Sequence, residues 1–308
     1  MFKYDFDVPD NKKYRIIVHT DCKNEADDQF ALAHHLMTPK FKVQGIIAGH
    51  FDLNSQEYGK GNTATASYNE ISKVLELMGI EEEYPVLLGA QTALADINTP
   101  IDSQGAGFIV QEAMKEDEHP LYIVFLGAIT DLGSAILMEP KICDRMTAVW
   151  IGGGDYPKGG SEFNLVNDIK AANIVFSSTM PLWQIPRNTY KQMAVSLAEL
   201  QLRVKPYGKI GKYLFEQMVA FNSKLAKYQA WPHGETWGLG DQGTVTVLLE
   251  ELEKKDYEEI AAPYINDDMT YVQNNDNRLI RVYHTLNTRL TMEDFYAKLA
   301  LNFPEKDS

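Results

Sequence analysis

The feature that most constrains the fold is a regular alternation of short apolar runs with helix-like segments. Six apolar runs have the length of buried strands: 14–19, 41–49, 84–90, 121–128, 146–154 and 180–186. Amphipathic segments typical of helices lie among them: 27–38, 63–79, 105–116, 130–141 and 168–178. Strands that alternate with helices predict an α/β fold with a mostly parallel central sheet and helices on both faces.

The pattern changes after residue 187. Segments 190–204 and 210–229 read as helices, and a further apolar helix starts at 243, which predicts extra C-terminal helices. Segment 268–287 reads as two strands paired through a turn at 274–277. No composition break or low-complexity linker interrupts the chain, so we expect residues 1–308 to form a single domain.

Composition narrows the class of partner. The formal net charge is −14 over 308 residues, which argues against binding to nucleic acid or to an anionic membrane. Two cysteines make no disulfide framework, and neither a secretory signal nor a membrane-spanning run is evident. We therefore expect a soluble, cytoplasmic protein that can concentrate cations locally.

An acidic cluster follows the first apolar run, in the stretch "DCKNEADD". Asp21, Glu25, Asp27 and Asp28 lie within eight positions, where like charges repel unless a cation lies among them. Carboxylates are preferred ligands of Ca²⁺ and Mg²⁺, although the spacing is not that of an EF-hand. The alternative is a helix cap with solvated neighbours, which accounts for Asp27 but less easily for four acids. Spacing alone leaves both interpretations open.

Polar residues at other predicted strand exits and helix starts extend this pattern. Thr130 follows the fourth strand, Asp241 precedes the apolar helix at 243, and Glu162 and Asn164 lie at a further helix start. Ligands of parallel sheets bind beyond the carboxyl ends of the strands, so these residues could converge on one crevice. For Thr130 and Asp241 the simpler interpretation, taken alone, is again helix capping.

These segments together resemble the nucleoside hydrolase family of the inosine/uridine-preferring type, in a divergent branch. "DCKNEADD" is similar to the family's D-x-D-P-G-x-D-D signature, and "SEFNLVNDIKAANIVF" to its A-E-F-N-x-x-x-D-P-E-A-A segment. "LGAITDLGSA" looks like its L-G-P-L-T-N-L-A segment, and "WGLGDQGTV" stands where the family has a His-Asp pair before a helix. The resemblance covers most of residues 14–250 in the expected order.

The resemblance implies a Ca²⁺-dependent hydrolase that cleaves the N-glycosidic bond of a ribonucleoside or related N-riboside. It implies metal ligation by carboxylates of Asp21, Asp28 and Asp241 and by the main-chain oxygen of Thr130. It further implies that Asp21 or Glu25 activates water beside Asp28. The ribose hydroxyls would be bound by Asp27, Asn24, Glu162 and Asn164. Homodimers or homotetramers are implied as well.

Two departures from the family pattern leave other functions open. Lys23 stands where the family has its second Asp, and Gly240 where it has the His before the metal-binding Asp. His50 and His233 could replace that His, but both lie in predicted loops, and we interpret them as surface residues. One alternative is a relative that binds a nucleoside or carbohydrate without turnover, and another is a purely structural metal.

Aromatic residues near the predicted strand exits could stack on a base. Phe163, Trp183 and Tyr190 are the candidates, although such aromatics more often belong to the core.

Overall fold

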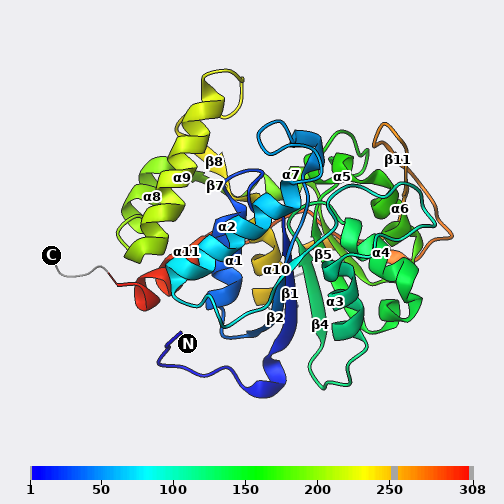
Figure 1. The fold of residues 1–308 in the computed structure, drawn as a ribbon, viewed down its shortest axis with the longest axis horizontal. Helices are drawn as coiled ribbons and strands as arrows, with labels where there is room; N and C mark the ends of the chain where they lie inside the picture. Colours follow the sequence, from blue (N-terminus) through cyan, green and yellow to red (C-terminus); the bar gives the residue numbers. More distant parts are fainter. Residues whose placement is uncertain (1, 251–255, 305–308) are drawn as a thin grey trace.

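A central sheet of eight strands runs through the computed structural model, which describes residues 2–250 and 256–304 (Figure 1). The strand order is β3-β2-β1-β4-β5-β6-β12-β9. All neighbours pair in parallel except β12 and β9, which pair antiparallel. The strands are β1 (Tyr14–Thr20), β2 (Phe41–Ala48), β3 (Val86–Leu88), β4 (Leu121–Phe125), β5 (Met146–Ile151), β6 (Leu182–Ile185), β9 (Tyr257–Ala261) and β12 (Leu279–Tyr283). The predicted mostly parallel sheet is confirmed.

Successive side chains of a strand point to opposite faces, and β1 shows why its apolar run is continuous. Ile16 and Val18 belong to a hydrophobic cluster on one face, and Ile17 belongs to a second cluster on the other. All three side chains are fully buried, because β1 lies between β2 and β4 and helices cover both faces.

Helices cover both faces, as predicted (Figure 1). One face packs against α1 (Asp28–Met37), α2 (Thr63–Met78) and α10 (Gly243–Leu249). α9 (Gly208–Ala226) packs on α2, and α11 (Thr288–Asn302) packs on α1 and α10. The other packs against α3 (Gln104–Ala113), α4 (Thr130–Met138) and α6 (Ile169–Ser177). No helix within the described ranges is long and apolar enough to cross a membrane.

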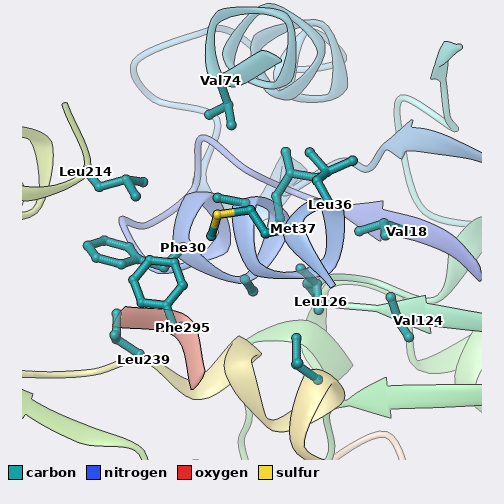
Figure 2. Close-up of a cluster of buried hydrophobic side chains, with 14 of the residues drawn as sticks. Val18, Phe30, Leu36, Met37, Val74, Val124, Leu126, Leu214, Leu239 and Phe295 are labelled. Atoms are coloured by element: carbon teal, nitrogen blue, oxygen red, sulfur yellow. The ribbon is translucent and has the colours of Figure 1, made fainter. Parts of the chain in front are cut away.

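Helix α1 lies at the centre of the first layer, and all ten of its residues are buried. Figure 2 shows Phe30 and Met37 of this helix between Val74 of α2 and Phe295 of α11. The rings of Phe30 and Phe295 are 5.8 Å apart between centroids. Because α1 begins at Asp28, this packing fixes the end of the helix that carries the acidic cluster.

The C-terminal segment pairs differently from the prediction. β11 (Tyr271–Val272) pairs with β10 (Tyr264–Ile265), and β12 pairs with β9 and β6, so the two predicted strands do not pair with each other. The turn itself is present, because the backbone N–H of Asn277 donates to the carbonyl of Asn274. Joining the large sheet buries Ile280 and Val282, which a hairpin of two strands would leave in water.

The predicted helix at 190–204 is wrong in its first part. The chain forms α7 (Arg187–Tyr190), β7 (Ala194–Ser196) and α8 (Leu197–Arg203) instead. β7 pairs antiparallel with β8 (Thr236–Gly238), which leads into the 3-10 turn η4 (Gly240–Gln242) before α10. This pairing brings the exit of β6 beside the chain that precedes Asp241. The remaining short elements are η1 (Asp10–Lys12), η2 (Asp52–Asn54), η3 (Pro140–Asp144) and α5 (Phe163–Asn167).

Candidate active site

A cavity of about 550 Å³ opens at the carboxyl ends of β1, β4, β5 and β6. Its acidic lining residues come from two distant parts of the chain and from the β5–α5 connection: Asp21, Glu25, Asp27, Asp28, Glu162 and Asp241. Asn24, Leu126 and Asn164 line it as well. The cavity therefore gathers most of the residues that the sequence singles out.

Three aspartates form the tightest part of the cavity. Asp27, Asp28 and Asp241 each offer a carboxylate oxygen, and these atoms lie within 4.8 Å of one another. Asp27 stands at the N-cap position of α1, yet its side chain makes no capping hydrogen bond. The side chain of Asp241 does not cap a helix either. The capping interpretation of these two residues is therefore wrong, and their carboxylates face each other instead.

Crowding and burial alter the acidity of the whole cluster. Burial, and then the charge of Asp28, raises the pKa of Asp21 well above its usual value. Burial raises the pKa of Glu25 to about 7, and that of Asp28 to about 6 against an opposing hydrogen bond from Thr20. Asp27 and Asp241 also have raised pKa values, from burial and then from a neighbouring carboxylate. A cation among the oxygens would lower these pKa values and favour the ionised cluster.

The loop between β1 and α1 directs two acids inward and one cation outward. Glu25 lines the cavity, whereas Lys23 does not and forms an ion pair of 3.0 Å with Glu70 of α2. Asp21 lines the cavity too, and its buried Oδ2 atom has no hydrogen-bond partner in the described part of the chain. Thr20 donates a hydrogen bond of 2.5 Å to Asp28 Oδ1, which fixes that carboxylate at the strand end.

Glu162 is held by four donors. Its carboxylate accepts from the backbone N–H groups of Gly153, Asn164 and Leu165 at 2.9–3.1 Å, and from the hydroxyl of Tyr190 at 3.0 Å. Two of these bonds cap α5. The amide of Asn164 donates to the carbonyls of Leu126 and Ile151, at 2.7 and 2.8 Å. Both side chains are therefore fixed in orientation before any ligand arrives.

Thr130 is not brought to the cavity wall. Its hydroxyl donates to Asp168 at 2.8 Å and lies 2.7 Å from His50 Nε2. The interpretation of His50 as a surface residue is wrong, since its side chain is 1% exposed and packs in this buried network. Burial lowers the pKa of His50. His233 is exposed, as expected.

Aromatic side chains form the outer wall. Phe163 and Tyr190 line the cavity, whereas Trp183 does not and packs against Tyr122 and Tyr283. Trp231 and Trp237 also line it, with ring centroids 4.7 Å apart. The sequence interpretation missed this pair, although the stretch "AWPHGETWGLGD" places two tryptophans directly before Asp241.

Gly240 leaves room for one of these aromatics. A Cβ atom at position 240 would lie 2.9 Å from Cδ2 of Tyr190, which is closer than real contacts of this kind. The ring of Tyr190 therefore occupies the space beside Gly240, and its hydroxyl reaches Glu162. The arrangement offers oxygen ligands for a hard cation, acids of near-neutral pKa, fixed polar groups and stacking surfaces.

Comparison with known proteins agrees with this geometry. Residues 16–292 match the model of the family described as inosine-uridine preferring nucleoside hydrolase. An inosine-uridine preferring nucleoside hydrolase from Leishmania major is 26% identical over 145 residues, 46% of each chain. The Crithidia fasciculata protein of the same description is 30% identical over 103 residues, 32% of each chain. These alignments thus span half or less of the curated relatives' length.

Among solved structures, a purine-preferring ribonucleoside hydrolase from Gardnerella vaginalis superposes with a TM-score of 0.76. The superposition covers 94% of this chain and 99% of that chain, at 17% identity. At this level of identity the likeness establishes a shared fold.

Proposed function

The chain belongs to the inosine-uridine preferring nucleoside hydrolase family, and we propose that it hydrolyses the N-glycosidic bond of a ribonucleoside or related N-riboside. The observation that carries the proposal is the buried group of Asp27, Asp28 and Asp241 inside the cavity at the strand ends. Polar groups for a sugar and aromatic rings for a base lie on the walls of that same cavity.

We propose Ca²⁺ as the cofactor, with Asp28 and Asp241 as ligands and Asp21 and Asp27 beside them. The donors fit a hard cation, because all are carboxylate oxygens and Asp21 Oδ2 is buried without a partner among the described residues. Thr130, whose main-chain oxygen the resemblance implies as a ligand, fits less well, since it does not line the cavity whereas Leu126 does. When bound, the ion would supply Lewis-acid chemistry that makes water a better nucleophile.

The acids of the β1–α1 loop would accept the proton that the attacking water releases. Glu25 or Asp21 accepts a proton from the attacking water, and a raised pKa suits a base that works near neutral pH. Lys23 takes no part in this step, because its charge is paired with Glu70 outside the cavity. The remaining carboxylates would stabilise positive charge that develops on the sugar in the transition state.

Ribose hydroxyls would be bound by Asp27, Asn24, Glu162 and Asn164. Glu162 and Asn164 are fixed by their backbone partners, so they would orient the sugar with little loss of side-chain entropy. The base would lie against Tyr190, Trp231 and Trp237, which stack through their faces.

The proposal is tested by release of reducing sugar from a panel of purine and pyrimidine ribonucleosides, with chelator and with Ca²⁺. We expect turnover of at least one ribonucleoside that chelator abolishes and Ca²⁺ restores. Thermal stabilisation by nucleosides without turnover of any of them would contradict the proposal and indicate a binding protein.

Substitution of Asp28 tests the site itself. We expect Asp28→Asn to lower kcat/KM by more than about 100-fold, because it removes a proposed ligand while keeping the side-chain volume. Asp144→Asn, an exposed residue of η3, is the matched control. The pH profiles of Asp21→Asn and Glu25→Gln would identify the base. Full activity of a folded Asp28→Asn would exclude the proposed site.

We further propose that the chain is one domain that assembles as a homodimer or homotetramer in the cytoplasm. Phe30 near the N-terminus packs on Phe295 near the C-terminus, which supports one domain. Cys22 and Cys143 are buried free thiols, which suits a reducing compartment. Light scattering of the purified protein tests the assembly.

A further inference from the structure

We propose that the riboside taken by this cavity carries an anionic substituent, a phosphate on the sugar or a carboxylate on the base, which Arg187 and Lys191 bind. This inference rests on the proposed function, because it names the substrate class of the same site. The observation behind it is a contrast of charge within one cavity. Six carboxylates line the cavity. Two cationic side chains, which follow the end of β6, also line it.

The two cations share one face of the chain. Arg187 begins α7 and Lys191 follows its last residue, and the backbone N–H of Lys191 donates to the carbonyl of Arg187. Residues four positions apart on a helical turn project to the same side. Both residues line the cavity, so one ligand can contact both of them.

Arg187 is fixed in place and still has donors to spare. Its Nε atom donates to Asp155 at 2.8 Å, and its Nη1 atom donates to the carbonyl of Ser161. Its Nη2 atom forms no hydrogen bond with the described residues. A guanidinium held in this way is already ordered before a ligand binds, so binding costs little side-chain entropy. Its free N–H groups match the geometry of a phosphate or carboxylate.

Lys191 has no comparable structural role. Its ammonium forms no hydrogen bond or ion pair within the described residues, although its charge helps to lower the pKa of Asp155. Asp155 neutralises one positive charge, so Arg187, Lys191 and Asp155 together leave one net positive charge, while Glu162 of the same cavity also acts on Arg187. In a chain of net charge −14, a cation at the wall of an acidic cavity favours ligands that carry negative charge of their own.

A matched set of substrates tests the proposal: uridine, uridine 5′-monophosphate and orotidine, with inosine and inosine 5′-monophosphate as the purine pair. We expect kcat/KM to be higher for an anionic member than for its neutral counterpart, and the advantage to shrink as salt is added. The phosphate arm and the carboxylate arm identify which substituent is recognised. Equal or higher kcat/KM for the neutral nucleosides would overturn the inference and leave the proposed hydrolysis standing.

Lys191→Gln is the decisive variant. Lys191 is exposed and forms no hydrogen bond or ion pair within the described residues, so its replacement should not disturb folding. We expect kcat/KM to fall roughly fivefold for the preferred anionic substrate and by less than about twofold for uridine. Lys191→Glu should enlarge the difference. Lys141→Gln, an exposed lysine of η3 that does not line the cavity, is the control. An equal effect on charged and neutral substrates would contradict the inference.

Binding of product fragments separates this inference from the proposed reaction. Calorimetry compares ribose 5-phosphate with ribose, and orotate with uracil, on the wild-type protein and on Lys191→Gln. If no riboside is hydrolysed, the proposed function fails, yet tighter binding of one anionic fragment that Lys191→Gln removes still supports the anion site. Binding that does not depend on the charge of either fragment overturns it.

Discussion

At position 240 the chain has no side chain, and the ring of Tyr190 fills the space beside it. The Tyr190 hydroxyl then donates to Glu162, the residue proposed to bind a ribose hydroxyl. Burial and the neighbouring charge of Glu162 raise the pKa of Tyr190, so the phenol stays protonated and remains a donor. Because Gly240 has no side chain, the Tyr190 ring can lie beside it, and from there the hydroxyl reaches Glu162.

Gly240→Ala tests that coupling. The added Cβ would lie 2.9 Å from Tyr190 Cδ2, so we expect the ring to shift and the free energy of unfolding to fall by about 1–3 kcal/mol. KM for the nucleoside should rise, because Glu162 would lose a hydrogen bond that orients it. Urea denaturation and steady-state kinetics measure the two effects.

Two controls make this result specific. Gly238→Ala lies on the same cavity wall, but its added Cβ would meet no atom within 4 Å, so it should be nearly neutral. In the Tyr190→Ala background, Gly240→Ala should cost little, which gives a coupling energy of about 1–3 kcal/mol. Equal costs of Gly240→Ala with and without the Tyr190 ring would show that the two residues act independently.

At the scale of elements, the loop before α1 is clamped by two helices. Glu70 of α2 binds Lys23 and Gln29 and accepts from the hydroxyl of Tyr213 on α9. Gln217 of α9 donates to the carbonyl of Ala26 at 2.7 Å. These bonds keep the Lys23 ammonium paired outside the cavity, while Glu25 lines it.

Glu70→Gln removes the charge at the centre of this clamp. Because Glu70 is 5% exposed and has three partners, we expect the free energy of unfolding to fall by about 1–3 kcal/mol. Catalysis should also weaken, since Lys23 would be free to pair with acids of the cavity. Glu76→Gln, an exposed glutamate of the same helix, is the control in urea denaturation and in kinetics. An effect no larger than that of Glu76→Gln would argue against the clamp.

How far the sequence predicts each element depends on whether the relevant contacts are local. The helix predicted at 27–38 and the strand at 14–19 match α1 and β1 closely, because the length of each apolar segment and the polar residues that bound it are local features of the sequence. The pairing of β12 with β6 and β9 could not be predicted in this way. This pairing depends on the apolar surface of β12 that becomes buried when it joins β6, a strand far away in the sequence.

The same distinction applies to the site. The rule that ligands bind beyond strand ends follows from topology alone, and it predicts one crevice for the acidic cluster, Asp241 and Thr130. Asp27, Asp28 and Asp241 do line one cavity, whereas Thr130 does not. The Thr130 hydroxyl is oriented by Asp168, a residue 38 positions away, and the buried His50 contacts that hydroxyl. Trp231 lies in a loop without periodicity, so only its nearness to Asp241 in the sequence could have pointed to it.

At the scale of the whole molecule, the fold concentrates negative charge at the end of the sheet where β1 and α1 meet. The chain has 43 acidic against 29 basic residues, and it buries several of those acids in one cavity. Such a site costs free energy whenever its acids ionise without a cation. Stability of the protein should therefore depend on pH and on metal together.

The metal-free protein should lose stability as pH rises. The pKa of Glu25 is raised from 4.5 to about 7 and that of Asp28 from 3.8 to about 6, so the folded state keeps protons that the unfolded state has released. Between about pH 4 and pH 7 the free energy of unfolding then falls by about 1.4 kcal/mol per pH unit for each extra proton held. Ca²⁺ should displace these protons, so its stabilisation should grow with pH and vanish near pH 4.

Urea denaturation from about pH 4.5 to about pH 7.5, with chelator and with Ca²⁺, measures this effect. Glu25→Gln should flatten the metal-free curve, because it removes one of the groups that titrate in this range. Asp144→Asn, on an exposed surface, should leave both curves unchanged. If the curves with chelator and with Ca²⁺ were parallel, the ion would not bind among these carboxylates. Their pKa values would then describe only a buried acidic cluster, because a cation that displaces their protons must make the two curves diverge as pH rises.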